Sequence, residues 1–214
     1  MIRTLLLLIC SLTPIIGQAN SIDINLSEHA FGFYYSKLSG SGDYGHSEIA
    51  SEAIYSTDKS KNDNFMLNFS LHIVDETGSK SPGLDAGLGP KLFLGTSEYI
   101  FTDSSGTESQ RTQNMVALAL GGLMDYRIPR MNRVVIHARA YYAPDITAMV
   151  SIEDLLEFGL RFGYEVGPST NLYLGYRLLR GSFRVAVASG NGDQHDVKAR
   201  NIDNSLSLGV KMNF

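Results

Sequence analysis

Apolar and polar residues alternate along most of the chain, so that apolar side chains recur at every second position. In residues 64–75 the apolar face consists of Phe65, Leu67, Phe69, Leu71 and Ile73. A period of two is that of a β-strand whose two faces meet different surroundings. The same alternation recurs in seven further segments: residues 45–56, 84–94, 116–126, 132–143, 155–166, 172–177 and 202–214. The pattern predicts an all-β protein with at least eight strands.

Charged residues gather on the face opposite to the apolar one. In a soluble β-sandwich this face would meet water and the apolar face would form a closed core. In a transmembrane barrel the apolar face meets lipid, and opposite charges pair in the interior. Under the barrel interpretation an interior polar network is expected from His137, Arg139, Glu157, Arg161, Glu165, Arg177 and Lys211.

The last ten residues favour the barrel, because a soluble protein gains little from an aromatic residue at a terminus that frays in water. The closing strand of a barrel must stay paired and apolar on its lipid face to its end. This ending resembles the C-terminal signature of bacterial outer-membrane proteins, which implies recognition by the barrel-assembly machinery. The expected assembly signal and lipid face comprise Leu206, Leu208, Val210, Met212 and Phe214.

The expected fold is therefore an antiparallel, up-and-down transmembrane β-barrel of eight to ten strands. The apolar phase of residues 21–38 changes after Leu26, which predicts a break at residues 27–29. Two short strands there would give an even total of ten, whereas one strand would give nine. Pro90 lacks a backbone N–H, so a bulge or irregularity is expected beside it.

The lengths of the connections orient the barrel, because outer-membrane barrels have short periplasmic turns and longer external loops. With Phe214 in the periplasm, the connections at residues 57–63, 96–113, 143–151 and 188–196 fall outside. The connections at residues 76–81, 127–131 and 167–171 fall inside. The longest connection is thus external.

The first 19 residues have the features of a cleaved signal peptide. A basic start is followed by an apolar core, and Gly17, Gln18 and Ala19 precede the expected cleavage site. Residues 20–214 would then form a single barrel domain in the outer membrane of a Gram-negative bacterium. Cys10, the only cysteine, lies in the removed segment, so no thiol or disulfide is expected in the mature chain.

The balance of charged residues indicates which classes of partner to expect. The chain has 18 basic and 22 acidic residues, a formal charge of −4, and loss of Arg3 with the signal peptide makes it −5. Nucleic acid is therefore not an expected partner, whereas outer-membrane lipid and lipopolysaccharide are. Residues 190–196 offer oxygen ligands without the spacing of an EF-hand, so no metal or other cofactor is expected.

The chain as a whole resembles the YfaZ-type family of small bacterial outer-membrane proteins. The resemblance rests on SIDINLSEHAFGFYYS at the start of the mature chain, HARAYYAPD at residues 137–145, YEVGPSTNLYLGYR at residues 164–177 and the closing strand. It implies an outer-membrane β-barrel, but it brings no established activity and no functional residues.

The expected function is that of a non-enzymatic integral outer-membrane protein with a structural or surface-interaction role through its external loops. A narrow solute channel is one alternative, in which Ala117, Ala119 and Gly121 leave a path through the interior. A lipid-modifying enzyme is the other, with His137 as a general base. No nucleophile motif accompanies His137, so an interior charge network is the preferred interpretation of that histidine.

Overall fold

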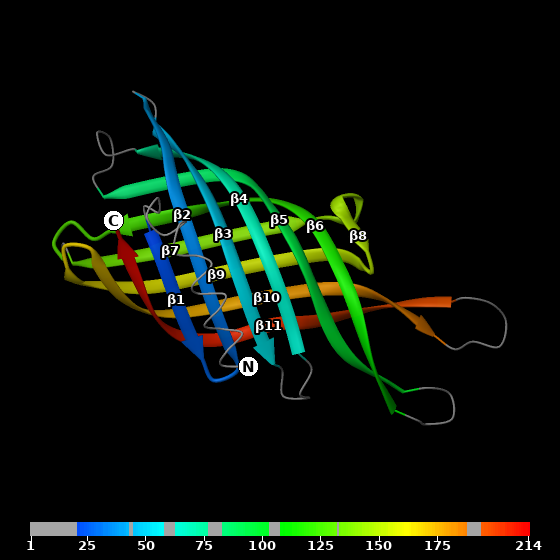
Figure 1. Ribbon diagram of the computed structural model, residues 1–214. Helices are drawn as coiled ribbons and strands as arrows, with labels where there is room; N and C mark the ends of the chain where they lie inside the picture. Colours follow the sequence, from blue (N-terminus) through cyan, green and yellow to red (C-terminus); the bar gives the residue numbers. More distant parts are fainter. Residues whose placement is uncertain are drawn as a thin grey trace.

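The computed structural model describes residues 21–42, 45–57, 63–76, 83–102, 108–131, 133–187 and 194–214. They form a closed antiparallel barrel of ten strands, within the predicted range of eight to ten (Figure 1). The predicted signal peptide, residues 1–19, lies outside the described residues, as do parts of the predicted connections. Within the described part of the chain, no helix is long and apolar enough to cross a membrane.

Strands that follow each other in the sequence pair side by side, and β1 pairs with β11 and β5 with β6 to complete the ring. A short 3-10 turn, Asp145–Thr147, and the short strand β8, Ala148–Val150, continue the line of β7 along β6. The ten main strands are β1 (Ser21–Ser27), β2 (Ala30–Gly42), β3 (Gly45–Thr57), β4 (Asp63–Glu76), β5 (Leu84–Thr102), β6 (Glu108–Arg127), β7 (Val134–Ala143), β9 (Ile152–Gly167), β10 (Thr170–Val187) and β11 (Gln194–Asn213).

The predicted break at residues 27–29 is confirmed, and β1 and β2 are the two short strands of the ten-strand alternative. The Ser27 hydroxyl explains the turn. Its oxygen accepts a hydrogen bond from the backbone N–H of Ala30 at 2.8 Å. A serine side chain that bonds to nearby backbone in this way competes with the ladder and favours a turn.

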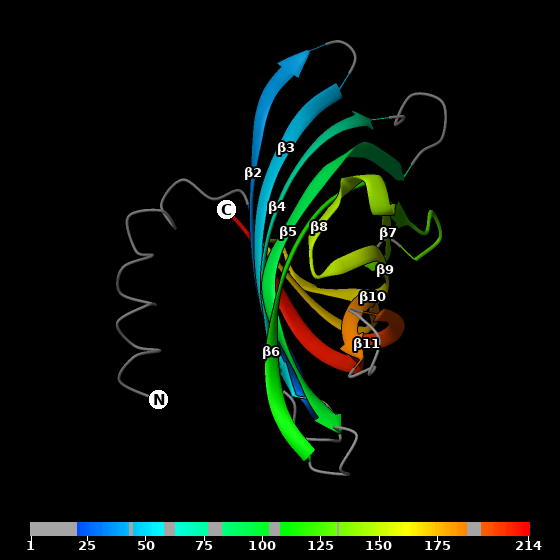
Figure 2. The same cartoon turned by 90° about the vertical axis from the view of Figure 1, so that its right-hand side faces the viewer.

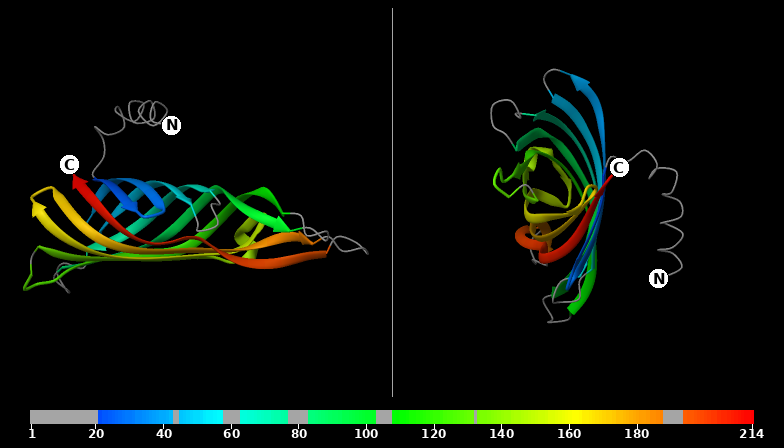
Figure 3. Two further views of the ribbon diagram at one scale, coloured as in Figure 1. Left: turned by 90° about the horizontal axis from the view of Figure 1, so that it is seen from below. Right: turned by 90° about the vertical axis from the view of Figure 1, so that its left-hand side faces the viewer.

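Two walls make up the barrel. Strands β2 to β6 form one wall and β7 to β11 form the other in the view of Figure 2. The hairpins β5–β6 and β10–β11 project at the end opposite to the C-terminus (Figure 3). Long hairpins at one end and the two-residue turn between β9 and β10 at the other agree with the predicted asymmetry of the connections.

The alternation divides the two faces of each strand as predicted. On β4 the inward side chains of Met66, Asn68, Ser70 and His72 are buried, and the apolar residues between them are exposed on the outside. The same division holds along β9, where Glu157 is buried and its neighbours Leu156 and Phe158 are exposed. The outer surface is therefore apolar where a soluble protein would be polar.

Three predicted boundaries are wrong, and one of them is the start of β11 at Gln194, which lies inside the predicted connection at residues 188–196. Residues 96–113 are mostly strand rather than loop, since β5 and β6 remain paired as far as Thr102 and Glu108. Strand β10 likewise extends to Val187, well beyond the predicted residues 172–177. In residues 96–102 polar residues stand on both faces, so the alternation that identifies a strand is lost there. In β10 beyond Arg177 the alternation continues with its polarity reversed, because Leu179 and Phe183 are buried inside and Arg180 is exposed outside.

The irregularity predicted beside Pro90 is an interruption of the ladder rather than a bulge, because the pairing of β4 with β5 skips Gly89 and Pro90 but keeps its register on both sides. A register shift that the alternation does not predict lies on β11. The shift occurs where Leu179 pairs with Asp203 and Arg180 with Asn201, which leaves Ile202 as an extra residue. Ile202 and Asp203 are both buried. The alternation that places Ile202 on the lipid face is therefore wrong, because a bulge interrupts the inward and outward sequence.

Glycine is required where β5 and β6 approach their neighbours most closely. Gly89 pairs with Gly121 across these strands. A Cβ on Gly89 would lie 1.8 Å from the Leu71 carbonyl oxygen, and a Cβ on Gly121 would lie 2.0 Å from that of Ala140. Since the obstructing atoms are backbone, neither clash can be relieved by a rotamer change.

Gly89→Ala is therefore expected to reduce the folded fraction of the barrel severely. The measurement is the fraction of protein that shows heat-modifiable migration on gels after refolding in detergent. Gly167→Ala is the control, because a Cβ at that position has nothing within 4 Å. Equal folded fractions for the two variants would contradict the close approach at Gly89.

Candidate functional site in the barrel interior

A buried group of ion pairs crosses the interior at mid-height. Lys91 Nζ on β5 lies 3.1 Å from Glu52 Oε2 on β3 and 2.7 Å from Glu157 Oε2 on β9. Arg139 on β7 reaches the same two carboxylates, at 2.9 Å from Glu52 and 2.8 Å from Glu157. Four strands from both walls are thereby joined through four side chains.

Arg177 on β10 extends this group to the last strand. Its Nη1 lies 3.1 Å from Glu52 Oε1, and its Nε donates to Asp203 on β11. We call the six residues Glu52, Lys91, Arg139, Glu157, Arg177 and Asp203 the charged layer. It contains three carboxylates and three cations, so its formal charge is zero. Buried charges that are balanced and hydrogen-bonded avoid most of the cost of desolvation.

A second polar group lies between the charged layer and the C-terminal end of the barrel. The Arg161 guanidinium pairs with Asp23 and lies 4.6 Å from the centre of the Tyr173 ring, while the Tyr173 hydroxyl also donates to Asp23. His137 Nδ1 lies 2.6 Å from Asp125 Oδ1. These groups surround a cavity of about 90 Å³, which has room for about three water molecules.

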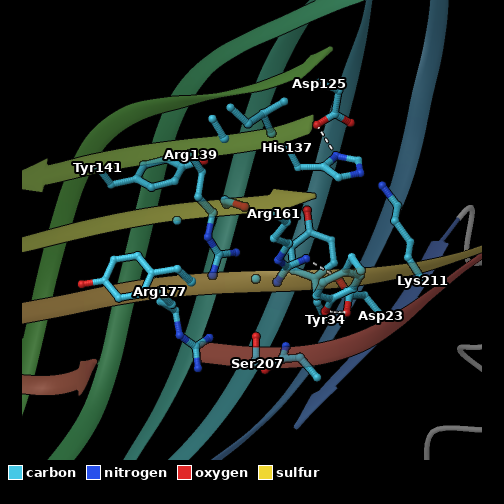
Figure 4. A pocket seen from close by; sticks show the side chains of 18 of the residues that line it. Asp23, Tyr34, Asp125, His137, Arg139, Tyr141, Arg161, Arg177, Ser207 and Lys211 are labelled. Atoms are coloured by element: carbon cyan, nitrogen blue, oxygen red, sulfur yellow. Dashed lines mark hydrogen bonds and ion pairs between the residues drawn. The ribbon is translucent and has the colours of Figure 1, made fainter. Parts of the chain in front are cut away.

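Most of the interior polar residues predicted from the sequence meet around this cavity. Figure 4 shows Arg139, Arg161 and Arg177 on the neighbouring strands β7, β9 and β10, with His137 and Lys211 facing the same space. Glu157 lies behind them in the charged layer. Glu165 is separate, because it pairs with Arg127 at 2.5 Å where both side chains are partly exposed.

Sequence reasoning missed several partners of these residues, namely Asp23, Glu52, Lys91, Asp125, Tyr173 and Asp203. Their inward positions follow from the alternation of their own strands. Their pairing does not follow, because it depends on which strands face one another across the lumen.

An apolar layer closes the interior above the charged layer, on the side away from the C-terminus. Four of its members are each two positions away from a residue of the charged layer on the same strand, and each is at most 1% exposed. They are Ile54, Phe93, Leu155 and Leu179. They pack in one cluster with Met66, Met115, Ile152, Phe183 and Ile202, among others. We call this cluster the apolar layer. Its side chains pack against one another across the lumen at this height.

The small residues that suggested a solute path are part of this packing. Ala117 and Ala119 are fully buried members of the same cluster. The space beside Gly121, where a side chain would stand, is taken up by the Ala140 carbonyl oxygen. The expectation that these three residues leave space is therefore wrong, since larger side chains from other strands fill the volume beside them.

His137 has a carboxylate as its partner and is bonded to no nucleophile that the structure describes. Asp125 is its hydrogen-bonding partner, and in the described part of the chain no serine or threonine hydroxyl is bonded to its ring. A general base needs the group that it deprotonates within hydrogen-bonding reach. No group of three His, Cys, Asp or Glu side chains that could hold a metal ion occurs among the described residues.

The C-terminal pattern lies where the ring closes. Strand β11 pairs with β1 from Asn213 at Ser21 to Ser207 at Ser27. Leu206, Leu208 and Phe214 are exposed on the outer surface, and Val210 and Met212 are partly exposed. The five predicted lipid-facing residues therefore flank the junction between the first and last strands.

A closed, antiparallel barrel with an apolar exterior and a charged interior belongs to the class of outer-membrane β-barrels. Solved structures similar to this chain include the NanC porin, at 13% identity and a TM-score of 0.41, over 91% of this chain and 99% of that one. Another is the β-domain of the Bordetella autotransporter BrkA, at 14% identity and a TM-score of 0.45, over 92% of this chain and 100% of that one. No family profile and no curated protein matches the chain.

Proposed function

We propose that this chain is an integral outer-membrane protein of the YfaZ type that neither conducts solutes nor catalyses a reaction. In this proposal it acts at the cell surface through its outer rim and external loops. Its partners are outer-membrane lipid and lipopolysaccharide, and the barrel-assembly machinery during biogenesis.

The apolar exterior supports insertion into a membrane. Each wall carries a row of exposed apolar side chains, such as Phe69 and Leu71 on β4 and Phe158 and Phe162 on β9. Burying such a surface in lipid is favourable, and in water it would promote aggregation. Export by the predicted signal peptide and recognition of residues 205–214 by the assembly machinery complete the proposed route.

The apolar layer is the observation that carries the proposed absence of conduction. Water or an ion crossing the barrel would have to pass between side chains such as Phe93, Leu179 and Phe183, which are 0% exposed. The charged layer beneath adds a second barrier, because its side chains bond to one another across the lumen. A conducting pore of this fold would need a continuous polar path.

Purified barrel inserted into planar lipid bilayers is accordingly expected to give no discrete conductance steps. A general porin reconstituted in parallel checks that the assay detects pores, and heat-modifiable migration checks that the inserted protein is folded. Reproducible steps from the wild-type chain would contradict the proposal and favour the channel alternative.

The His137–Asp125 pair is the observation that favours the enzyme alternative, since a histidine oriented by a carboxylate supplies two of the three members of a catalytic triad. The pair lies inside the barrel beside Arg161 and Lys211 rather than on the lipid surface. A lipid ester would have to enter the lumen to reach it. A charge pair that stabilises the interior is the simpler proposal.

A further inference from the structure

The barrel wall is incomplete above the β1–β2 turn. Strand β1 pairs with β11 only as far as Ser207, and in the described part of the chain β11 has β10 as its only backbone partner beyond that point. Side chains replace the missing ladder. Ser56 Oγ on β3 donates to the Ile202 carbonyl at 2.7 Å, and Asn64 Nδ2 on β4 donates to the same oxygen at 3.3 Å. We call this side-chain junction the seam.

A cavity lies at the seam. Its volume is about 370 Å³, about four times that of the interior cavity. This is room for about a dozen water molecules, and it falls in the range of roughly 300–1,000 Å³ that small-molecule sites occupy. Seven of the twelve residues that line it carry a hydroxyl or an amide group, with Thr57, Asn64, Ser97, Asn201, Asn204 and Ser205 among them.

The chemistry of the lining suits sugar hydroxyls. The two carboxylates and the guanidinium in the lining already have partners: Asp203 bonds to Arg177, Glu98 accepts from Gln110 at 2.6 Å, and Arg200 donates to Gln113 at 2.8 Å. Asn201, Asn204 and Ser205 make no side-chain hydrogen bond to any part of the chain that the structure describes. Amides and hydroxyls donate and accept without net charge, as the ring hydroxyls of a saccharide require.

The position of the cavity indicates that the saccharide is attached to a lipid. Leu26 pairs with Leu208 just below the turn, and both side chains, like that of Leu206, are strongly exposed on the outer surface. The two residues that precede Leu206 in the chain, Asn204 and Ser205, line the cavity. The wall thus changes from apolar to polar within two residues, which matches the junction between the acyl chains and headgroup of an amphiphile.

We propose that the seam cavity binds the saccharide headgroup of a glycolipid of the outer leaflet, with its acyl chains lying against Leu26, Leu206 and Leu208. This inference rests on the proposed outer-membrane orientation, with the C-terminus in the periplasm. It names one site on the wall through which the barrel would contact lipopolysaccharide.

The test compares two variants. One carries both Asn201→Leu and Asn204→Leu, and the other carries Asn114→Leu alone. Asn114 is also exposed on the outside, on β6, and does not line the cavity. None of the three asparagines belongs to the seam hydrogen bonds, and a leucine at the edge of the lipid face is compatible with folding. If the double leucine variant does not fold, as judged by heat-modifiable migration, the double alanine variant replaces it.

Binding of purified rough-type lipopolysaccharide is measured in mixed micelles, with phosphatidylethanolamine and the free oligosaccharide of the same lipopolysaccharide as comparison probes. The wild type and Asn114→Leu are expected to bind the glycolipid equally. The double variant is expected to bind it about tenfold more weakly, and both comparison probes should bind the wild type at least about tenfold more weakly than the glycolipid.

Three results would overturn the proposal: equal affinity of the double variant and Asn114→Leu, equal affinity for phosphatidylethanolamine, or equal affinity for the free oligosaccharide. The last result would assign the cavity to a soluble sugar. Fractionation of the expressed chain tests the outer-membrane location separately, so failure of the site is distinguishable from failure of the proposed location.

Discussion

Glu52→Gln is expected to lower the free energy of unfolding of the barrel by about 3–5 kcal/mol. The Glu52 carboxylate contacts Lys91, Arg139 and Arg177 and is almost completely buried. Glutamine keeps the shape but removes the charge, which leaves three buried cations opposite two carboxylates. The measurement is urea unfolding in lipid vesicles, followed by circular dichroism because the chain contains no tryptophan.

Two further variants separate the charge balance from other effects of the substitution. Glu165→Gln removes a carboxylate from the partly exposed pair with Arg127, so a loss of less than about 1 kcal/mol is expected. Adding Lys91→Met to Glu52→Gln restores two cations opposite two carboxylates, and the double variant should recover part of the lost stability. Equal losses for Glu52→Gln and Glu165→Gln would show that the charged layer does not stabilise the barrel.

Phe93→Ala is expected to cost about 3–5 kcal/mol in the same unfolding experiment. The Phe93 side chain is 0% exposed within the apolar layer, and its ring centre also lies 5.0 Å from Lys91 Nζ. The substitution therefore leaves a cavity that its neighbours cannot fill, and it removes a cation–π contact that links the apolar layer to the charged layer.

Phe69→Ala on the outer face of β4 is the matched control for Phe93→Ala. Its side chain is 49% exposed, so lipid molecules can occupy the space that the ring leaves. We expect a clearly smaller loss than for Phe93→Ala. An equal loss of unfolding free energy for the two variants would mean that interior packing stabilises this barrel no more than the lipid-facing side chains do.

The sequence predicted the faces of the strands well and the ends of the strands poorly. The inward position of Arg139, Glu157 and Arg177 follows from alternation within single strands, and the structure places all three inside. The strand ends at Thr102 and Val187 are not predicted, because the apolar outer face ends before them. Polar residues stand on both faces of residues 96–102, and beyond Arg177 the apolar side chains of β10 face inward. The inward turn of Ile202 was missed because a bulge depends on the partner strand.

The sequence by itself determined the fold class, the break between β1 and β2 and the apolar exterior. These are local properties, since a side chain two positions away along a strand always lies on the same face. Only the tertiary structure decided which charges meet, because Glu52 and Arg177 are 125 residues apart and become partners through closure of the ring. The apolar layer and the seam cavity also arise from side chains of several strands at one height, and no segment of sequence contains that information.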